Sequence, residues 1–401
     1  MKIAKFVLSL TFIALMFPLA ALAQEEEGNK RHPTYTLMGR DAPAADSPLN
    51  PNFVVAEESR LSEGGFWRSP YINESLVGLV VADIDGDGQN EVIYASTKTV
   101  TVTRFGGGKL GQLAKFTVMT TEVIASVDAL DLTGDGRMEI ICSVQNETFN
   151  PASKIFSFTG DDLVVMADKI PWYLRVVGGP GGQFLAGQRA STDRKAVYAG
   201  KVMRMGFDGS QITSQGSVGL PSNINLFNFS LGRLGRSGIQ MVAAIKFPTE
   251  HIFLFENGTE RAWESKEEYG GTMTHLLPAN ASVESNRFRE FLPSRLLITD
   301  IDGDGQNELI VAKNDRGGVP FMSGQRAFTS GVIQAFKYTN MSLTPFFRTR
   351  TLPGPAVDYA LADFKNNGNI ELVVAVVTEQ KSGALKEGRS VIVSYEIRGP
   401  Q

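Results

Sequence analysis

The chain has 401 residues, of which 42% are hydrophobic and 20% are charged, and its formal net charge is −4. This length suffices for one large domain or two ordinary ones, and without a basic block we expect no nucleic-acid partner. The 41 glycines, spread among many short apolar runs, indicate frequent turns and therefore β-structure.

Residues 1–23 have the three-part form of a secretory signal peptide. Lys2 and Lys5 make the start positive, an apolar run continues to Phe17, and small residues end at Ala23. The run is shorter than the roughly 20 apolar residues that a membrane span requires. We therefore expect cleavage after Ala23, export to the periplasm or the extracellular space, and no transmembrane segment in the mature chain.

The remaining sequence divides into a leader and a repetitive domain. Residues 24–52 are polar and rich in proline, and we expect them to form a flexible leader. Residues 53–401 repeat one pattern, in which a nine-residue acidic loop runs into an apolar strand. Four copies of this loop are recognisable, at residues 83–91, 131–139, 300–308 and 363–371.

The segments that follow each loop alternate between apolar and polar residues, which is typical of strands with one buried face. Units of four short antiparallel strands in roughly 45 to 68 residues are typical of propeller blades. We count six units, starting near residues 76, 124, 172, 222, 290 and 355, and a count of seven stays open. The expected fold is therefore an all-β propeller over residues 53–401, with insertions at 276–293 and 314–331.

Two units between the second and third loops lack the acidic pattern. In the unit near residue 231, Gly232 stands where the first Asp of a loop is expected. The last unit reaches only a third strand, whereas residues 53–70 resemble the fourth strands of other units, with Trp67 matching Trp263. We expect this N-terminal strand to complete the last blade and close the ring, which removes exposed edges.

The acids of the loops fall at positions 1, 3 and 5, followed by Gly at 6 and Glu at 9. Calcium takes six to eight hard oxygen ligands, and alternate side chains of a tightly curled loop can converge on one ion. An EF-hand is excluded because its closing Glu stands at position 12 between helices, whereas strand-forming residues follow here. We expect calcium ligands at Asp83, Asp85, Asp87, Gln89 and Glu91; at Asp131, Thr133, Asp135, Arg137 and Glu139; and at Asp300, Asp302, Asp304, Gln306 and Glu308.

Not every copy of the loop suits calcium equally. Thr133 replaces the acid at position 3 of the second loop, which weakens that site. The fourth loop has Lys365 at position 3 and Asn367 at position 5, and the Lys would repel a cation unless it pointed away. The alternative is that all these acids are polar turn formers that bind no ion.

The loops resemble the calcium loops of FG-GAP and VCBS-type repeats, the propeller repeats also found in integrin α-subunit heads. The resemblance covers about residues 53–398 and is strongest in the first and third loops. The combined Phe-Gly and Gly-Ala-Pro signature is absent, so the VCBS-type label fits better. The resemblance implies a six- or seven-bladed propeller that binds calcium between the first and second strands of a blade.

The sequence offers no catalytic constellation. Cys142 is the only cysteine, so no intramolecular disulfide can form, and His32, His251 and His275 fit no Ser-His-Asp or zinc pattern. We expect calcium to play a structural part in a non-enzymatic, monomeric propeller that serves as a protein-binding or scaffold module. The first alternative is a lectin-like propeller with a glycan partner, and the second is a polysaccharide lyase-like enzyme. Candidate sugar-stacking residues are Trp67, Trp172 and Trp263.

Overall fold

A computed structural model describes residues 66–179, 181–235, 239–258, 260–281, 288–317, 326–380 and 388–397. All of them belong to one compact unit, Leu37–Gln401. The expected signal peptide, the leader and residues 53–65 of the expected domain lie outside the described residues. In the described residues we find strands and turns, and no helix that is long and apolar enough to cross a membrane.

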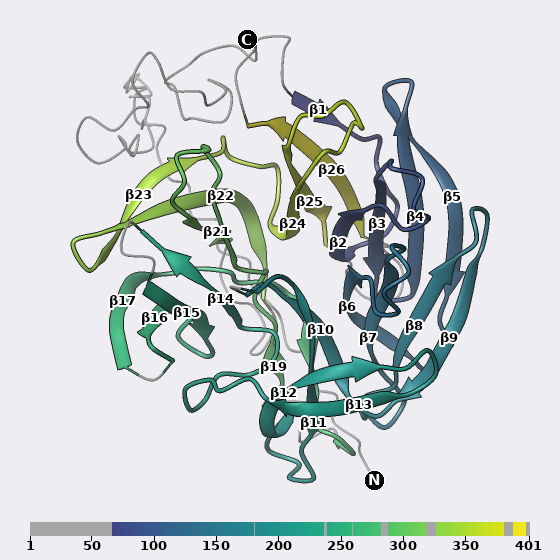
Figure 1. The fold of residues 1–401 in the computed structure, drawn as a ribbon, viewed down its shortest axis with the longest axis horizontal. Coiled ribbons are helices and arrows are strands. Elements are labelled where there is room, and N and C mark those ends of the chain that lie inside the picture. The colour runs from purple at the N-terminus through teal and green to yellow at the C-terminus, as the bar shows by residue number, and fades with distance from the viewer. Residues whose placement is uncertain are drawn as a thin grey trace, which may run out of the picture. The chain divides into compact units, whose positions relative to one another are not determined.

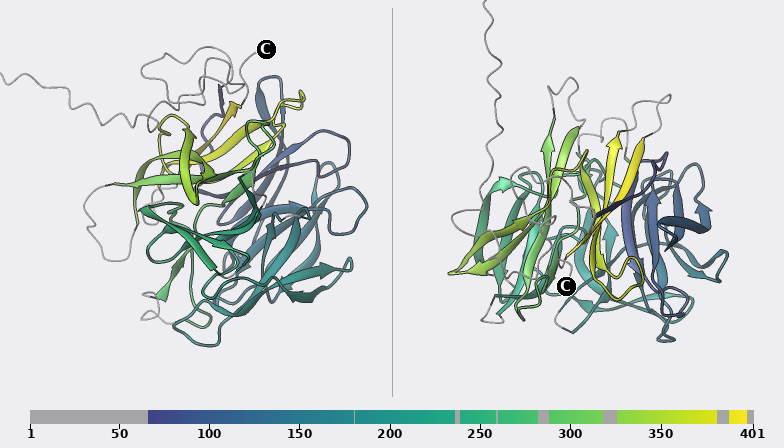
Figure 2. Two further views of the ribbon diagram at one scale, coloured as in Figure 1. Left: turned by 60° about the vertical axis from the view of Figure 1, so that its left-hand side comes forward. Right: turned by 90° about the horizontal axis from the view of Figure 1, so that it is seen from above.

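The strands form six four-stranded antiparallel sheets arranged as a β-propeller (Figures 1 and 2). Blades 1 to 3 consist of β2 (Leu76–Ala82), β3 (Glu91–Ser96), β4 (Thr99–Gly106) and β5 (Lys109–Thr117); β6 (Val123–Leu130), β7 (Glu139–Gln145), β8 (Ser153–Phe158) and β9 (Leu163–Ile170); and β10 (Tyr173–Val177), β11 (Phe184–Ala190), β12 (Tyr198–Phe207) and β13 (Ile212–Ser217). Blades 4 to 6 consist of β14 (Phe229–Leu234), β15 (Ile239–Lys246), β16 (His251–Glu256) and β17 (Glu260–Glu268); β20 (Leu297–Thr299), β21 (Glu308–Arg316), β22 (Phe328–Thr339) and β23 (Ser342–Arg348); and β24 (Ala356–Ala362), β25 (Glu371–Glu379), β26 (Arg389–Glu396) and β1 (Phe66–Arg68). The predicted all-β propeller is confirmed, with six blades rather than seven.

Blade 4 shows where the predicted repeat was wrong in detail. Gly232 does not begin a loop, because it lies inside β14 and pairs with Met241 of β15. The last pair of this hairpin is Leu234 with Ile239, so the connection is shorter than the acidic loops. An added Cβ at Gly232 would approach the Ile298 side chain to 2.4 Å, so close packing against blade 5 explains this glycine.

The ring closes as predicted, through pairing of β1 with β26. Phe66, Trp67 and Arg68 pair with Tyr395, Ser394 and Val393, respectively. The Trp67 ring packs against Phe105 and Phe364, and its indole Nε1 donates a hydrogen bond to the Gly108 carbonyl oxygen at 2.8 Å. A strand from the N-terminal end of the described chain thereby joins blade 6 to blade 1.

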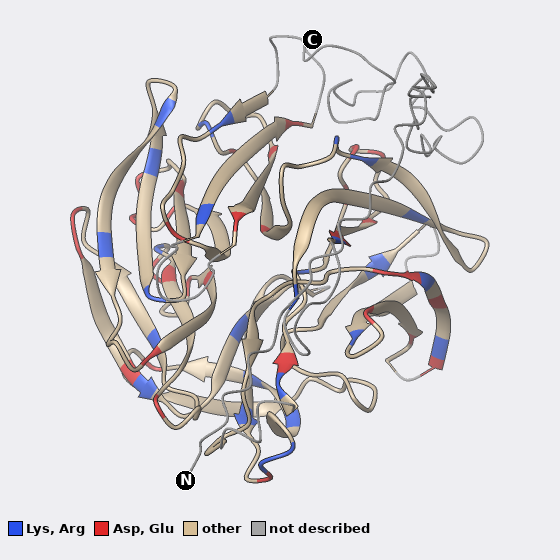
Figure 3. Ribbon diagram, turned by 180° about the vertical axis from the view of Figure 1, so that it is seen from behind, with Lys and Arg blue, Asp and Glu red and all other residues tan. Residues whose placement is uncertain are grey.

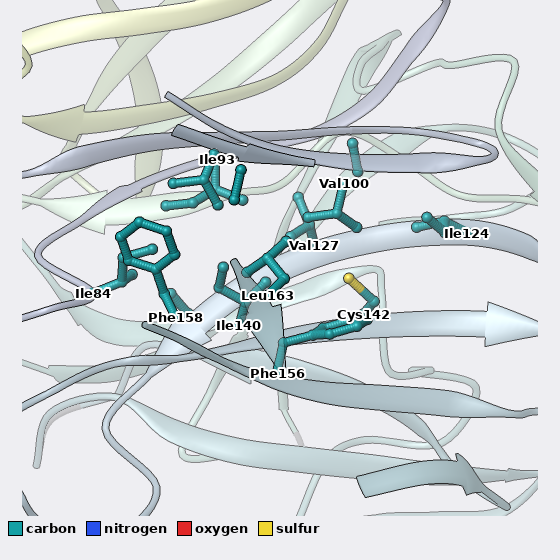
Figure 4. Packing of buried hydrophobic residues seen from close by; sticks show 14 of the residues in the cluster. Ile84, Ile93, Val100, Ile124, Val127, Ile140, Cys142, Phe156, Phe158 and Leu163 are labelled. Atoms are coloured by element: carbon teal, nitrogen blue, oxygen red, sulfur yellow. The ribbon is translucent and has the colours of Figure 1, made fainter. Parts of the chain in front are cut away.

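The core lies between neighbouring blades, where apolar side chains of adjacent sheets interlock. Figure 4 shows the cluster between blades 1 and 2, which includes Ile93, Val127, Ile140 and Phe156. Cys142 is buried in the same cluster, and burial raises the pKa of its thiol, as suits a small hydrophobic residue. These blade-to-blade contacts hold the ring together, since each blade buries its faces only against its neighbours.

The described parts of the connection between β17 and β20, residues 269–281 and 288–296, include side chains that lie at the starts of innermost strands. The connection holds a small sheet of β18 (His275–Leu276) and β19 (Glu290–Phe291). Thr272 and Pro293 of this connection line a small cavity together with Val77 and Ala125, at the starts of β2 and β6. The described parts of the connection therefore lie at the face from which the innermost strands begin.

Loss of the Trp67 ring should weaken ring closure. We expect Trp67→Ala to lower the free energy of unfolding by about 3 kcal/mol, because it removes a half-buried ring that packs against the buried Phe364 and against Phe105 between blades 6 and 1. Urea denaturation measures the change. Tyr71→Ala is the matched control, because Tyr71 lies beside β1 but is 55% exposed, and it should cost less than about 1 kcal/mol. Equal losses in the two variants would contradict this role of Trp67.

Candidate functional site

The four acidic loops occupy equivalent places in four blades. Residues 83–91 join β2 to β3, and 131–139 join β6 to β7. Residues 300–308 join β20 to β21, and 363–371 join β24 to β25. Each loop thus connects the first and second strands of its blade, as the resemblance implied. All four lie on the face where the innermost strands end, which we call the acidic-loop face.

The four loops share one backbone conformation. Positions 4 and 6 have positive φ angles in every loop, at Gly86 and Gly88 in the first and at Asn366 and Gly368 in the fourth. This left-handed conformation favours glycine and is tolerated by asparagine. The sequence interpretation had explained only the glycine at position 6. The fourth loop therefore keeps the fold of the others although its charges differ.

The acid at position 1 is a turn former in each loop. Both carboxylate oxygens of Asp83 accept backbone hydrogen bonds, from Gly86 N at 2.7 Å and from Gly88 N at 2.8 Å. Asp131 and Asp300 accept equivalent pairs of bonds, and Asp363 accepts bonds from Asn367 N at position 5 and Gly368 N at position 6. The alternative interpretation of the acids as turn formers therefore describes position 1 well, and the remaining acids need a separate explanation.

The closing Glu ties the end of the loop to its second residue. In the first loop Glu91 Oε2 accepts a hydrogen bond from Ile84 N at 3.0 Å, and Glu308 accepts one from Ile301 N at 3.1 Å. Ile84 and Ile301 are buried, so each loop is anchored in the core at its second residue. Leu132 and Glu139 form the same contact in the second loop, at 2.8 Å.

Glu308 is buried in an unfavourable setting for a carboxylate. It is 0% exposed, and its second oxygen, Oε1, makes no hydrogen bond and has only Lys337 Nζ, at 3.9 Å, as an ion-pair partner. Burial raises its pKa to about 8; the bond from Ile301 opposes this shift, and the nearby charge of Asp302 adds to it. A buried carboxylate oxygen without a donor fits a bound cation at this place.

The structure gathers the predicted ligands unequally. Acidic groups of Asp83, Asp85 and Glu91 lie within 4.8 Å of one another, as do those of Asp300, Asp302 and Asp304. Asp131, Asp135 and Glu139 of the second loop form no such group among the described residues, and no contact is found for Thr133.

At position 7 the hydrogen bonds found among the described residues are donated to the acid at position 5. The backbone N–H of Gln89 donates to Asp87 Oδ1 at 2.8 Å, and that of Arg137 donates to Asp135 Oδ1 at 2.9 Å. The side-chain amide of Gln306 donates to Asp304 Oδ2 at 3.3 Å. None of these contacts uses the backbone carbonyl at position 7, which is the oxygen that the sequence interpretation adds to the site.

Two basic residues that the sequence interpretation missed reach into the loops. Arg104 of β4 binds Asp85 Oδ2 at 2.9 Å and Asp87 Oδ2 at 2.8 Å, and it also contacts Glu91. Lys337 of β22 binds Asp302 Oδ2 at 2.8 Å and Asp304 Oδ2 at 2.7 Å. Both had been interpreted only as members of alternating strands. The sequence shows a basic residue on the third strand of each of these two blades. Which acids that residue contacts depends on strand pairing.

In the fourth loop the cation comes from the loop itself. Lys365 Nζ lies 2.6 Å from Glu371 Oε1 and 3.0 Å from Glu396 Oε1. Burial lowers the pKa of Lys365, but its bonds to the two Glu residues outweigh this and raise it. The Lys points inward rather than away, so the donor set of this loop does not fit calcium.

Neighbouring loops also contact one another. Asn90 N donates to Asn366 Oδ1 at 2.6 Å, and Asn366 Nδ2 donates to Asn90 O at 3.1 Å, which links the first loop to the fourth. Asn307 Nδ2 donates to Arg233 O at 2.8 Å, which links the third loop to blade 4. The asparagine at position 8 thus fastens a loop to the preceding blade in the ring.

A channel of about 530 Å³ runs along the innermost strands of all six blades. Arg295 lies at this channel and binds Asp358 Oδ2 at 2.8 Å and Asp128 Oδ1 at 3.2 Å. Arg175 lines the same channel and is buried, with its guanidinium carbon 5.6 Å from the centroid of the Phe227 ring. Residues of blades 2, 3 and 6 and Arg295, two positions before β20, therefore meet in one buried network of charges.

Removal of the central guanidinium should destabilise the ring. We expect Arg295→Met to lower the free energy of unfolding by about 3–5 kcal/mol, because Asp128 and Asp358 would stay buried without their partner. Arg233→Met is the matched control, since Arg233 lines the same channel but is exposed, and it should change stability by less than about 0.5 kcal/mol. Urea unfolding of both variants measures the difference, and a loss below 1 kcal/mol in Arg295→Met would contradict this assignment.

Comparison with known proteins supports the repeat. Residues 83–142 match the family of FG-GAP-like repeats. The matched segment runs from the first acidic loop of blade 1 through β6 and the second loop, and it ends within β7 of blade 2. A search of curated proteins gave no match. The chain is thus a six-bladed β-propeller that carries an FG-GAP-like repeat at residues 83–142.

Proposed function

We propose that this protein is an exported, non-catalytic β-propeller that is stabilised by calcium and binds a protein partner. The observation that carries the calcium part is the third loop, where three carboxylates converge and Oε1 of Glu308 is buried without a hydrogen bond, 3.9 Å from Lys337 Nζ. Hard carboxylate oxygens are the ligands that calcium prefers. The FG-GAP-like match at residues 83–142 and the signal sequence support the same proposal.

Calcium would be held by the acids at positions 1, 3, 5 and 9 of the first and third loops. In the second loop Asp131, Asp135 and Glu139 would hold it. Calcium sites of extracellular modules bind with dissociation constants on the order of 0.1–1 mM. An ion at about 10 mM with a Kd of about 1 mM stabilises the folded state by roughly 1.4 kcal/mol for each site.

Calcium should therefore raise the melting temperature. We expect the mature protein to melt several degrees higher in 10 mM calcium than in chelator. Asp304→Asn should reduce this increase because it removes a carboxylate from the third loop, whereas Asp161→Asn, in an exposed turn of blade 2, should not. Differential scanning calorimetry measures all three proteins. Identical melting with calcium and with chelator would contradict the calcium proposal.

The face opposite the acidic loops offers the better surface for a protein partner. Phe247 is 40% exposed there, and it borders a cavity of about 340 Å³ that Tyr198, Asn225 and Glu290 also line. The guanidinium carbon of Arg326 lies 3.8 Å from the centroid of the Phe291 ring. Aromatic and arginine side chains are enriched in protein interfaces. Both predicted insertions border this face, through β19 and the connection between β21 and β22.

A glycan partner is less well supported. Sugar binding relies on exposed aromatic rings, whereas Trp67, Trp172 and Trp263 all pack against hydrophobic clusters. Basic and acidic residues are interspersed over the described strands, which suits a mixed polar interface (Figure 3). We therefore place the protein partner ahead of the lectin-like and lyase-like alternatives.

A capture experiment tests the binding proposal. Immobilised mature protein should retain a protein from the envelope or secreted fraction of the host, and Phe247→Ser should lose it because an exposed aromatic contact is removed. Met341→Ser is the matched control, since Met341 is 70% exposed in the turn between β22 and β23, at the acidic-loop face. Retention by Phe247→Ser at the wild-type level, or binding to a glycan array instead, would contradict the proposal.

A further inference from the structure

In the first, third and fourth acidic loops the residue at position 3 faces one residue on the third strand of the same blade, and the two carry opposite charges. Asp85 faces Arg104 at 2.9 Å, and Asp302 faces Lys337 at 2.8 Å. In the fourth loop the charges are reversed, with Lys365 Nζ at 3.0 Å from Glu396 Oε1.

Strand register shows that the third-strand residue is equivalent in the four blades, since it lies opposite the closing Glu. Glu91 pairs with Arg104, and Glu371 pairs with Glu396. Continuing the register of the neighbouring pairs by one residue places Lys337 opposite Glu308 and Ser157 opposite Glu139. The second loop, with neutral Thr133 at position 3, therefore has the neutral Ser157 on its third strand.

The basic partner lies among the groups that would hold calcium. Arg104 and Lys337 each bind the acids at positions 3 and 5 together. Burial lowers the pKa of Lys337, but its bonds to Asp302 and Asp304 outweigh this and raise it, so the ammonium stays charged. A divalent ion at the same acids would meet this positive charge within a few ångströms and must displace it.

We propose that this pair is a tether between loop and third strand that sets how far each loop depends on calcium, an inference that rests on the proposed calcium binding. In the first and third loops Arg104 and Lys337 hold the loop without an ion and compete with calcium. Among the described residues, no basic side chain is paired with the acids of the second loop, so calcium binds there without competition. In the fourth loop the reversed pair replaces the ion altogether.

Neutral variants test the competition. Isothermal titration of the mature protein with calcium should give affinities at least about tenfold higher in Arg104→Gln and Lys337→Gln than in wild type. Arg104→Lys and Lys337→Arg keep the charge and should bind as wild type does. In chelator the two neutral variants should melt below wild type, and calcium should restore more stability to them than to wild type. Unchanged or weaker calcium affinity in both neutral variants would overturn the competition.

A charge reversal tests the tether itself and needs no calcium. Asp302→Lys and Lys337→Glu, each alone, should lower the melting temperature in chelator because like charges then face each other. The double variant rebuilds the pair of the fourth loop, so it should melt near wild type in chelator and bind one calcium ion fewer. A double variant no more stable than the single ones would overturn the tether.

The outcomes distinguish the two proposals. Wild-type protein that binds no calcium in titration would contradict the proposed function and the competition together, while the stability of the reversed pair would still report on the tether. Calcium binding by wild type, with no gain in either neutral variant, would leave the proposed function standing and overturn the competition.

Discussion

The pairing of β1 with β26 is the constraint on which the ring depends. Three residue pairs join segments that lie more than 300 positions apart in the chain. The pairing continues past the strand, because Ser69 N donates to Ile392 O at 2.8 Å and Ile72 exchanges backbone bonds with Ser390 at 2.9 Å. Without these contacts β26 would be an exposed edge, and the apolar faces of blades 1 and 6 would lose their fixed alignment.

The acidic-loop face is coupled to this closure. The hydrogen bonds between Asn90 and Asn366 cross the same boundary between blades 6 and 1 that β1 closes from the outside. The boundary is therefore fixed at its outer strand by Trp67 and at its loop face by the asparagine pair. Ordering of the first loop would also favour ring closure, because the first loop and β1 lie at the same boundary between blades 6 and 1.

Charged side chains in the loops and at the channel form ion pairs with one another. Arg104, Lys337 and Lys365 neutralise acids in three loops, and Arg295 neutralises Asp128 and Asp358 at the channel. A buried carboxylate is costly unless it is paired and hydrogen-bonded. In a protein whose only cysteine is buried and free, these pairs and the loop contacts take the part that cross-links play in many exported domains.

Local sequence patterns determined the blades, the four loops and the closing strand. Alternation and turn residues such as Gly86 and Gly88 act within a few positions, so their consequences can be read along the chain. The tertiary structure decided the register at Gly232, the choice of six blades over seven and the partners of the acids. Arg104 lies 19 positions from Asp85, and Asp128, Arg295 and Asp358 are spread along more than half of the described chain. Spacing cannot predict such contacts, because strand pairing and ring closure bring these charges together.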